Sequence, residues 1–199
     1  MGGIISPRVS LFLVPYPFLL INFPFGGNLK QVKNYAGLFL VAGIIIALDQ
    51  WTKSLVRTLP LGATWLPAGW EWLLPYARIV NWYNTGAAFG SFASFGWLFT
   101  ILAFVVAGLI VYYYPQVDDR DWWLKLAMGM QMGGALGNVF DRLFFGGKVT
   151  DFISVSTFAV FNVADASISV GVAVLLLGVW LKERSEHNKA KDDGATISE

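Results

Sequence analysis

Residues Phe95–Tyr114 read FGWLFTILAFVVAGLIVYYY, a run of apolar and aromatic side chains without a single charge. A helix needs about 20 apolar residues to cross the roughly 30 Å hydrocarbon core of a bilayer. Trp97 near one end and the tyrosines at the other lie where aromatic belts form at the two membrane surfaces. This segment therefore predicts a transmembrane helix, which we interpret as the second of four.

Three further segments predict the other transmembrane helices. The first begins at Tyr35 and, because its apolar stretch is short, must continue past Asp49 toward Leu55. The third covers Trp122–Phe140 and the fourth covers Asn162–Leu181. The sequence thus predicts an all-α membrane protein with four transmembrane helices.

The composition of the whole chain agrees with a membrane protein and excludes several kinds of site. Charged residues make up 14% of the chain, whereas a typical soluble domain has about a quarter. Cysteine is absent and the single histidine, His187, lies in a polar tail. These absences argue against disulfides, Ser-His-Asp catalysis and metal sites built on Cys or His. The net charge of +1 indicates no nucleic-acid partner, and we expect neither a metal nor a cofactor.

The distribution of Lys and Arg predicts that both termini lie in the cytoplasm, because the segments on that side would hold nine of the fourteen basic residues. The outer connection between the first and second helices, Pro60–Gly90, is rich in Trp and Tyr and contains the alternating run Arg78–Tyr83. This pattern predicts a small β element, or cradle, on the outer membrane surface. We expect its aromatic part, Trp65–Trp82, to close over a substrate.

The two ends of the chain differ from the predicted membrane domain at 35–182. Residues 1–34 are apolar but contain several prolines, and proline in a helix interior costs about 3 kcal/mol. A signal peptide would need a small-residue cleavage site, which is not evident. We interpret this segment as an atypical extension, with a mis-assigned start as our hypothesis and a natural start near Val32. Residues 183–199 predict a polar, disordered cytoplasmic tail.

Polar and charged side chains gather at the outer ends of the predicted helices. Charges inside a bilayer are costly and usually mark function. Those at the predicted outer ends are Asp49, Lys53, Asn84, Asn138, Asp141, Arg142, Asp151, Asn162 and Asp165. A proton-coupled transporter would distribute such groups through the membrane depth. That reading is one alternative to an enzyme, and a non-catalytic membrane assembly factor is the other.

Glycines at every fourth position over Gly129–Gly137 predict that the third helix packs closely against a neighbour. We expect this packing to bring the outer ends of the third and fourth helices together, so that Asp151 and Asp165 face one another. Two adjacent carboxylates cannot easily both ionise, and the pair holds one proton near neutral pH. One member can activate water while the other protonates the leaving amine, which is the chemistry of an aspartic protease.

Several other charged residues have structural interpretations. Asp49 and Lys53 are four residues apart on one helix face, so we expect a structural ion pair. Asp141 directly precedes Arg142, and we interpret it as structural rather than catalytic. Arg142 would position either a neighbouring carboxylate or a lipid headgroup. Glu71 is expected to be a solvated loop acid.

Five blocks of the sequence resemble the motifs of lipoprotein signal peptidase, also called signal peptidase II, and occur in the family's order. They read LDQWTK (Leu48–Lys53), NTGAAFG (Asn84–Gly90), GGALGNVFDR (Gly133–Arg142), VTDFI (Val149–Ile153) and FNVADASI (Phe161–Ile168). The resemblance covers roughly residues 35–182. It implies an aspartic endopeptidase of the bacterial inner membrane, with four transmembrane helices, an external β-cradle and an active site near the outer face.

The resemblance also implies an activity and a set of site residues. The family removes the signal peptide of bacterial prolipoproteins by cleaving just before a diacylglyceryl-modified cysteine, and it is inhibited by the cyclic peptide globomycin. The implied partners are thus diacylglyceryl-prolipoproteins and membrane lipids. The implied catalytic pair is Asp151 and Asp165, which are separated by only 13 residues, so that the loop between them is short for the family. The implied supporting or substrate-binding residues are Asp49, Lys53, Asn84, Gly86, Asn138, Arg142 and Asn162.

Overall fold

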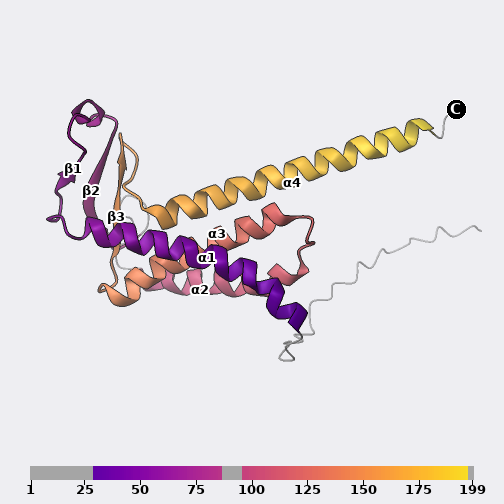
Figure 1. The fold of residues 1–199 in the computed structure, drawn as a ribbon, viewed down its shortest axis with the longest axis horizontal. Helices are drawn as coiled ribbons and strands as arrows, with labels where there is room; N and C mark the ends of the chain where they lie inside the picture. The colour runs from indigo at the N-terminus through magenta and orange to yellow at the C-terminus, as the bar shows by residue number, and fades with distance from the viewer. Residues whose placement is uncertain (1–28, 87–95, 197–199) are drawn as a thin grey trace, which may run out of the picture.

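The computed structural model describes residues 29–86 and 96–196, and the predictions for residues 1–28 lie outside this part of the chain. Within it, four long helices form a bundle with a three-stranded antiparallel sheet across one end (Figure 1). The helices are α1 (Leu29–Val56), α2 (Gly96–Tyr113), α3 (Trp122–Phe144) and α4 (Val163–Thr196). A mostly helical fold with a small sheet is therefore confirmed.

Three of the described helices are long and apolar enough to cross a membrane. These spans are Tyr35–Val56, Gly96–Gln116 and Val163–Ser185. Many of their large apolar side chains point outward, including Leu40 and Leu102, which are more than half exposed. Side chains of this kind face lipid in a membrane protein, so the structure indicates a multi-pass membrane protein.

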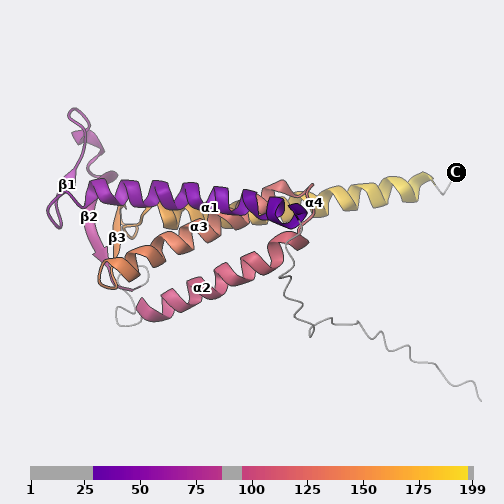
Figure 2. The same cartoon turned by 60° about the horizontal axis from the view of Figure 1, so that its bottom comes forward.

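Helix α3 lies in the middle of the bundle and contacts α1, α2 and α4 (Figure 2). Its glycine ridge packs closely against a neighbour, as predicted, and that neighbour is mainly α1. A Cβ atom at Gly129 or Gly133 would come within 2.8 Å of side chains on α1. The contact with α4 uses Gly134 instead, where a Cβ atom would lie 2.4 Å from the backbone oxygen of Ala164. A helix that touches neighbours on two sides needs small residues on two faces, and the four-residue spacing reveals only one of them.

The substitution Gly134→Ala is expected to destabilise the contact between α3 and α4. The added methyl group would overlap a backbone atom that cannot rotate away, and overpacking of this kind costs about 1–3 kcal/mol. The matched control is Gly108→Ala on α2, where a Cβ atom meets nothing within 4 Å. Thermal unfolding in detergent should show a lower midpoint for the first variant only. Equal midpoints for the two variants would contradict this view of the packing.

The sheet has the strand order β1–β2–β3. Strands β1 (Thr64–Trp65) and β2 (Ala77–Asn84) come from the connection between α1 and α2, where a β element was predicted. Strand β3 (Val149–Val155) comes from the connection between α3 and α4, and placing the whole sheet between the first two helices was wrong. Most of β3 is buried, so its sequence lacks the alternation of polar and apolar residues that marks a half-exposed strand.

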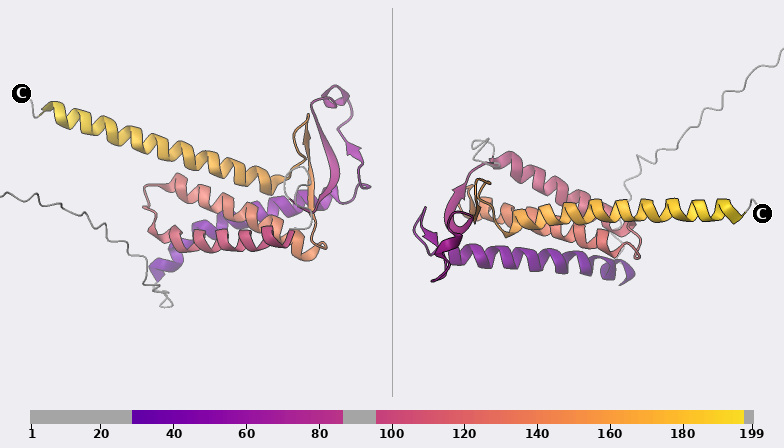
Figure 3. Two further views of the ribbon diagram at one scale, coloured as in Figure 1. Left: turned by 180° about the vertical axis from the view of Figure 1, so that it is seen from behind. Right: turned by 90° about the horizontal axis from the view of Figure 1, so that it is seen from above.

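Helix α4 continues to Thr196, and the prediction of a disordered tail after Lys182 is wrong. Residues 182–193 are rich in Lys, Glu, Arg and Ala, which are strong helix formers, and contain no proline or glycine. The helix therefore does not need lipid contact to continue. Figure 3 shows the C-terminal part of α4 projecting beyond the ends of the other helices.

Candidate active site

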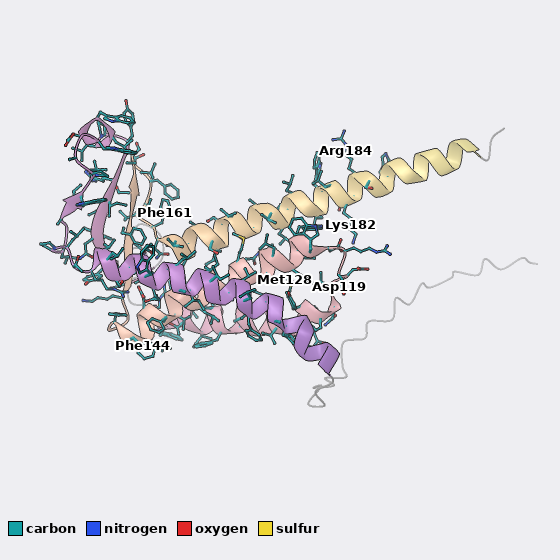
Figure 4. The ribbon with its side chains drawn as sticks, viewed as in Figure 1. Asp119, Met128, Phe144, Phe161, Lys182 and Arg184 are labelled. Atoms are coloured by element: carbon teal, nitrogen blue, oxygen red, sulfur yellow. The ribbon has the colours of Figure 1, made fainter. Side chains whose placement is uncertain are left out.

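The predicted polar residues gather where α1, α3 and the start of α4 meet strand β3. Figure 4 shows Phe144 and Phe161 toward this end of the molecule and Asp119, Lys182 and Arg184 at the opposite end. The side chains that are at most 1% exposed at the junction include Asp49, Lys53, Asp141, Asp151 and Asn162. Buried charges require partners, and the structure supplies them from several elements.

Asp165 lies in the first turn of α4, where the helix dipole favours a carboxylate. Asn162 precedes the helix, and its Oδ1 accepts a hydrogen bond from the Asp165 N–H at 2.9 Å. In return, the Asn162 N–H donates to Asp165 Oδ2 at 3.2 Å, an arrangement similar to a capping box. Asn138 of α3 donates from Nδ2 to Asp165 Oδ1 at 2.7 Å. Helix α3, through Asn138, and the residue before α4, Asn162, therefore both hold this carboxylate in place.

Asp151 lies in the middle of β3 and is 1% exposed. Asn162 donates from Nδ2 to Asp151 Oδ1 at 2.7 Å, so a single asparagine holds both aspartates. Burial, followed by the negative charge of Asp165, raises the pKa of Asp151 from 3.8 to about 7. Hydrogen bonds from the Asn84 and Asn162 amides act in the opposite direction. A carboxyl with this pKa can give up or accept a proton near neutral pH, as general acid–base catalysis needs.

A cavity of about 610 Å³ opens beside the two aspartates. Its polar lining includes Asn84, Gly86, Asn138, Arg142, Asp151 and Asp165. Its apolar lining includes Phe99, Phe158, Phe161, Ile168 and Val170. The cavity thus combines a pair of carboxylates with an apolar wall.

Asn84 and Gly86 form a turn at the edge of this cavity. The Gly86 N–H donates to Asn84 Oδ1 at 3.0 Å, which is an Asx turn. The Gly86 carbonyl lies 3.4 Å from Nη2 of Arg142, whose Nε is buried and has no hydrogen-bond partner among the described residues. The remainder of the NTGAAFG block, from Ala87 onward, lies outside the described residues.

The ion pair predicted between Asp49 and Lys53 is confirmed, with 2.7 Å between Nζ and Oδ2. Lys53 also donates to Asn138 Oδ1 at 3.0 Å. Asp49 accepts a hydrogen bond at 3.0 Å from the N–H of Ala164 in the first turn of α4. The pair therefore joins α1 to α4, which carries Asp165, and to α3, whose Asn138 contacts Asp165.

Asp141 is fully buried and does not line the cavity. Its carboxylate accepts hydrogen bonds from Gln50, at 2.8 Å, and from the Thr150 N–H, at 2.9 Å, and forms an ion pair with Arg57, at 2.8 Å. These contacts attach β3 to α1 and α3, next to Asp151. Our sequence reasoning missed Arg57, although its place four residues after Lys53 on the same helix face could have revealed it.

Most of the chain, including this site, is similar to a known protein family. Residues 41–181 match the family model described as signal peptidase (SPase) II. This chain belongs to the signal peptidase II family. The match covers most of the chain, and it contains both aspartates and each supporting residue that the sequence singled out.

Individual relatives agree with the family model. The lipoprotein signal peptidase of Shouchella clausii is 37% identical over 155 residues, which are 77% of this chain and 99% of that protein. That of Anoxybacillus flavithermus is 36% identical over 162 residues, or 79% and 92% of the two chains. A solved structure of a bacterial membrane enzyme, determined in meso at 2.3 Å resolution, matches with a TM-score of 0.66 and 27% identity, over 75% of this chain and 90% of that one. The chain is thus a membrane peptidase.

Proposed function

We propose that this peptidase removes the signal peptide of bacterial prolipoproteins, cleaving just before the diacylglyceryl-modified cysteine, and that Asp151 and Asp165 are its catalytic residues. The observation that carries the proposal is geometric. Both carboxylates line one cavity, and both accept hydrogen bonds from Asn162.

The two carboxylates can divide the work of hydrolysis. An ionised carboxylate removes a proton from water, and the resulting hydroxide attacks the carbonyl carbon of the scissile peptide bond. A protonated carboxyl donates its proton to the nitrogen of the cysteine as the C–N bond breaks. Asn138 and Asn162 hold the carboxylates in place during both transfers. Arg142 lines the same cavity, and its Nε, which has no partner within residues 29–86 and 96–196, supports a role in binding a substrate carbonyl.

The apolar part of the cavity suits the lipid of the substrate. Phe99 comes from α2, and Ile168 and Val170 come from α4, so the cavity lies between two helices that are apolar enough to span a membrane. A diacylglyceryl group in the outer leaflet would reach these side chains while the scissile bond lies beside the aspartates.

We further propose that residues 35–182 form the catalytic membrane domain with α3 as its fourth transmembrane helix. Unlike the other three described helices, it is not apolar enough by composition to count as a membrane span, since it carries polar groups of the site, and it contacts all three of them. With both termini in the cytoplasm, the sheet would form a cradle on the outer surface, and residues 183–199 would extend into the cytoplasm. Membrane lipids and globomycin would bind from the outer leaflet.

Cleavage of a purified substrate tests the proposed function. The peptidase, in detergent or lipid, is mixed with a prolipoprotein that carries the diacylglyceryl group and with the same prolipoprotein lacking it. A gel shift marking loss of the signal peptide is expected for the modified form only, and globomycin should prevent it. Cleavage of both forms at equal rates would rule out recognition of the lipid. Cleavage of neither, under conditions in which a related peptidase works, would refute the function.

The rate of cleavage is expected to fall as the pH rises through about 7. The pKa of Asp151 is about 7, so this carboxyl is protonated below that pH and ionised above it. Ionisation removes the proton that the leaving nitrogen needs and places two negative charges in one cavity. The measurement is kcat/KM from pH 5 to 9 at constant ionic strength. A rate that stays constant up to pH 9 would contradict the proton-donating role of the pair.

A further inference from the structure

A buried network of opposite charges lies next to the catalytic pair. Asp49 and Lys53 lie four residues apart on one face of α1, Arg57 follows at the same interval directly after the helix ends at Val56, and Asp141 comes from α3. Lys53 Nζ lies 2.7 Å from Asp49 and 3.3 Å from Asp141, and Arg57 lies 2.8 Å from Asp141. None of these four side chains lines the cavity, so the network has no direct access to substrate.

Two side-chain amides connect this network to the aspartates. Asn138 Oδ1 accepts hydrogen bonds from Lys53 Nζ, at 3.0 Å, and from Asn162 Nδ2, at 3.1 Å. Asn138 Nδ2 donates to Asp165, and Asn162 Nδ2 donates to Asp151, both at 2.7 Å. The ammonium of Lys53 is therefore one amide away from one aspartate and two amides away from the other. In a buried site, its charge favours the ionised form of Asp151.

The two aspartates and the charged side chains around them include one more carboxylate than cations. The charged groups facing the pair, or belonging to it, are Asp49 and Lys53 of α1, Arg57 directly after α1, Asp141 and Arg142 of α3, Asp151 of β3 and Asp165 of α4. With all of them ionised, four carboxylates outnumber three cations by one. The cluster is neutral when one carboxylate holds a proton. An uncompensated charge in a buried site is strongly disfavoured, so this neutral state is the preferred one.

We propose that the ion pair of Asp49 and Lys53 sets the number of protons on the catalytic pair, because it completes a buried cluster that is neutral when Asp151 and Asp165 share one proton. The inference rests on the proposed function. Lys53 is then a positioning residue that acts through charge, in addition to holding α1 against α3.

Removing one charge at a time should shift the proton count in opposite directions. Lys53→Met leaves an extra negative charge, which raises the pKa of Asp151 and favours a second proton on the pair. Asp49→Asn leaves an extra positive charge, which lowers that pKa. The double variant Asp49→Asn, Lys53→Met has the same net charge as the wild type, so its proton count should be restored.

The experiment compares the pH dependence of kcat/KM for the wild type, the two single variants and the double variant. The alkaline limb of the profile is expected to move up by roughly one pH unit in Lys53→Met, a tenfold change in proton affinity, and down by a similar amount in Asp49→Asn. In the double variant it should return to the wild-type position, even where the maximal rate stays low. Lys53→Gln removes the same charge but keeps a donor for Asn138, so it should shift the limb as Lys53→Met does.

Infrared titration of the carboxyl bands, with labelled aspartate, measures the same protonation without turnover. It keeps this inference separate from the proposed function, which fails if the wild type does not cleave the modified prolipoprotein. Opposite shifts that cancel in the double variant support the charge balance. The inference is overturned if the four profiles and titrations coincide on the pH axis and only the rates differ. It is also overturned if the double variant keeps the shift of Lys53→Met. Coinciding profiles and a persisting shift are the two results that a purely structural pair would give.

Discussion

Replacing Asp151 by Asn is expected to lower the cleavage rate by about 10²- to 10⁴-fold, the contribution of a general acid–base group, while making the folded peptidase more stable above pH 7. The pKa of Asp151 is higher in the folded protein than in the unfolded chain. The folded state therefore retains a proton that the unfolded chain has already released. Wild-type stability thus declines as the pH rises from about 4 to about 7 and stays lower above that. An asparagine never ionises, so the variant avoids this loss.

Two measurements check this result. A gel-shift assay with diacylglyceryl-modified prolipoprotein gives the rate, and thermal unfolding in detergent at about pH 4 and pH 8 gives the stability. The unfolding midpoint of Asp151→Asn, relative to the wild type, should be higher at the upper pH. Asp165→Asn should lose activity to a similar extent. Asp119→Asn, an exposed carboxylate at the other end of the molecule, is the control and should cleave normally. A fully active Asp151→Asn variant would refute the catalytic assignment.

Replacing Asp141 by Ala is expected to destabilise the peptidase by about 3–5 kcal/mol, the cost of removing one partner from a buried ion pair. The carboxylate is fully buried, and its loss would leave Arg57 without its ion pair and the Thr150 N–H without its acceptor. Strand β3 would then lose its attachment to α3 beside Asp151. We therefore expect reduced cleavage together with reduced stability, unlike the result for Asp151.

The control for Asp141 is an exposed pair with similar geometry. Asp121 and Lys182 lie 2.8 Å apart, as Asp141 and Arg57 do, but the lysine side chain is 51% exposed. Exposed ion pairs contribute about 0–1 kcal/mol, so Asp121→Ala should change the unfolding midpoint little. If unfolding in a mixed-micelle titration showed equal losses for the two variants, burial would not be the source of the stability of the Asp141 network.

The sequence was sufficient to predict those features that depend on local pattern. The uncharged run that ends at Tyr114 predicts α2, and the pairing of Asp49 with Lys53 follows from their spacing on one helix. The structure also brings Asp151 and Asp165 to one cavity, as their predicted membrane depth suggested. Local pattern is informative here because charged groups are costly inside a membrane and are therefore confined to a few places.

Features that depend on packing between distant segments were not predictable in this way. Strand β3 is covered on both sides, so its sequence does not alternate, and Gly134 lies outside the regular glycine ridge because it serves a second helix. The role of Arg57 depends on Asp141, which lies 84 residues away in the sequence. The end of α4 differs from the prediction for another reason, since a polar composition suggests disorder while these particular residues favour a helix.

The hydrogen bonds between Ile153 and Phe161 have a consequence for the shape of the cavity. The two residues pair through their backbones, at 2.8 and 3.0 Å, and the segment 156–160 connects the end of β3 to this pairing. Phe158 and its neighbours form one wall of the cavity. We therefore expect insertions or deletions in this segment to leave both carboxylates in place. A longer or shorter segment would therefore reshape this wall of the cavity while keeping the same pair of aspartates beside it.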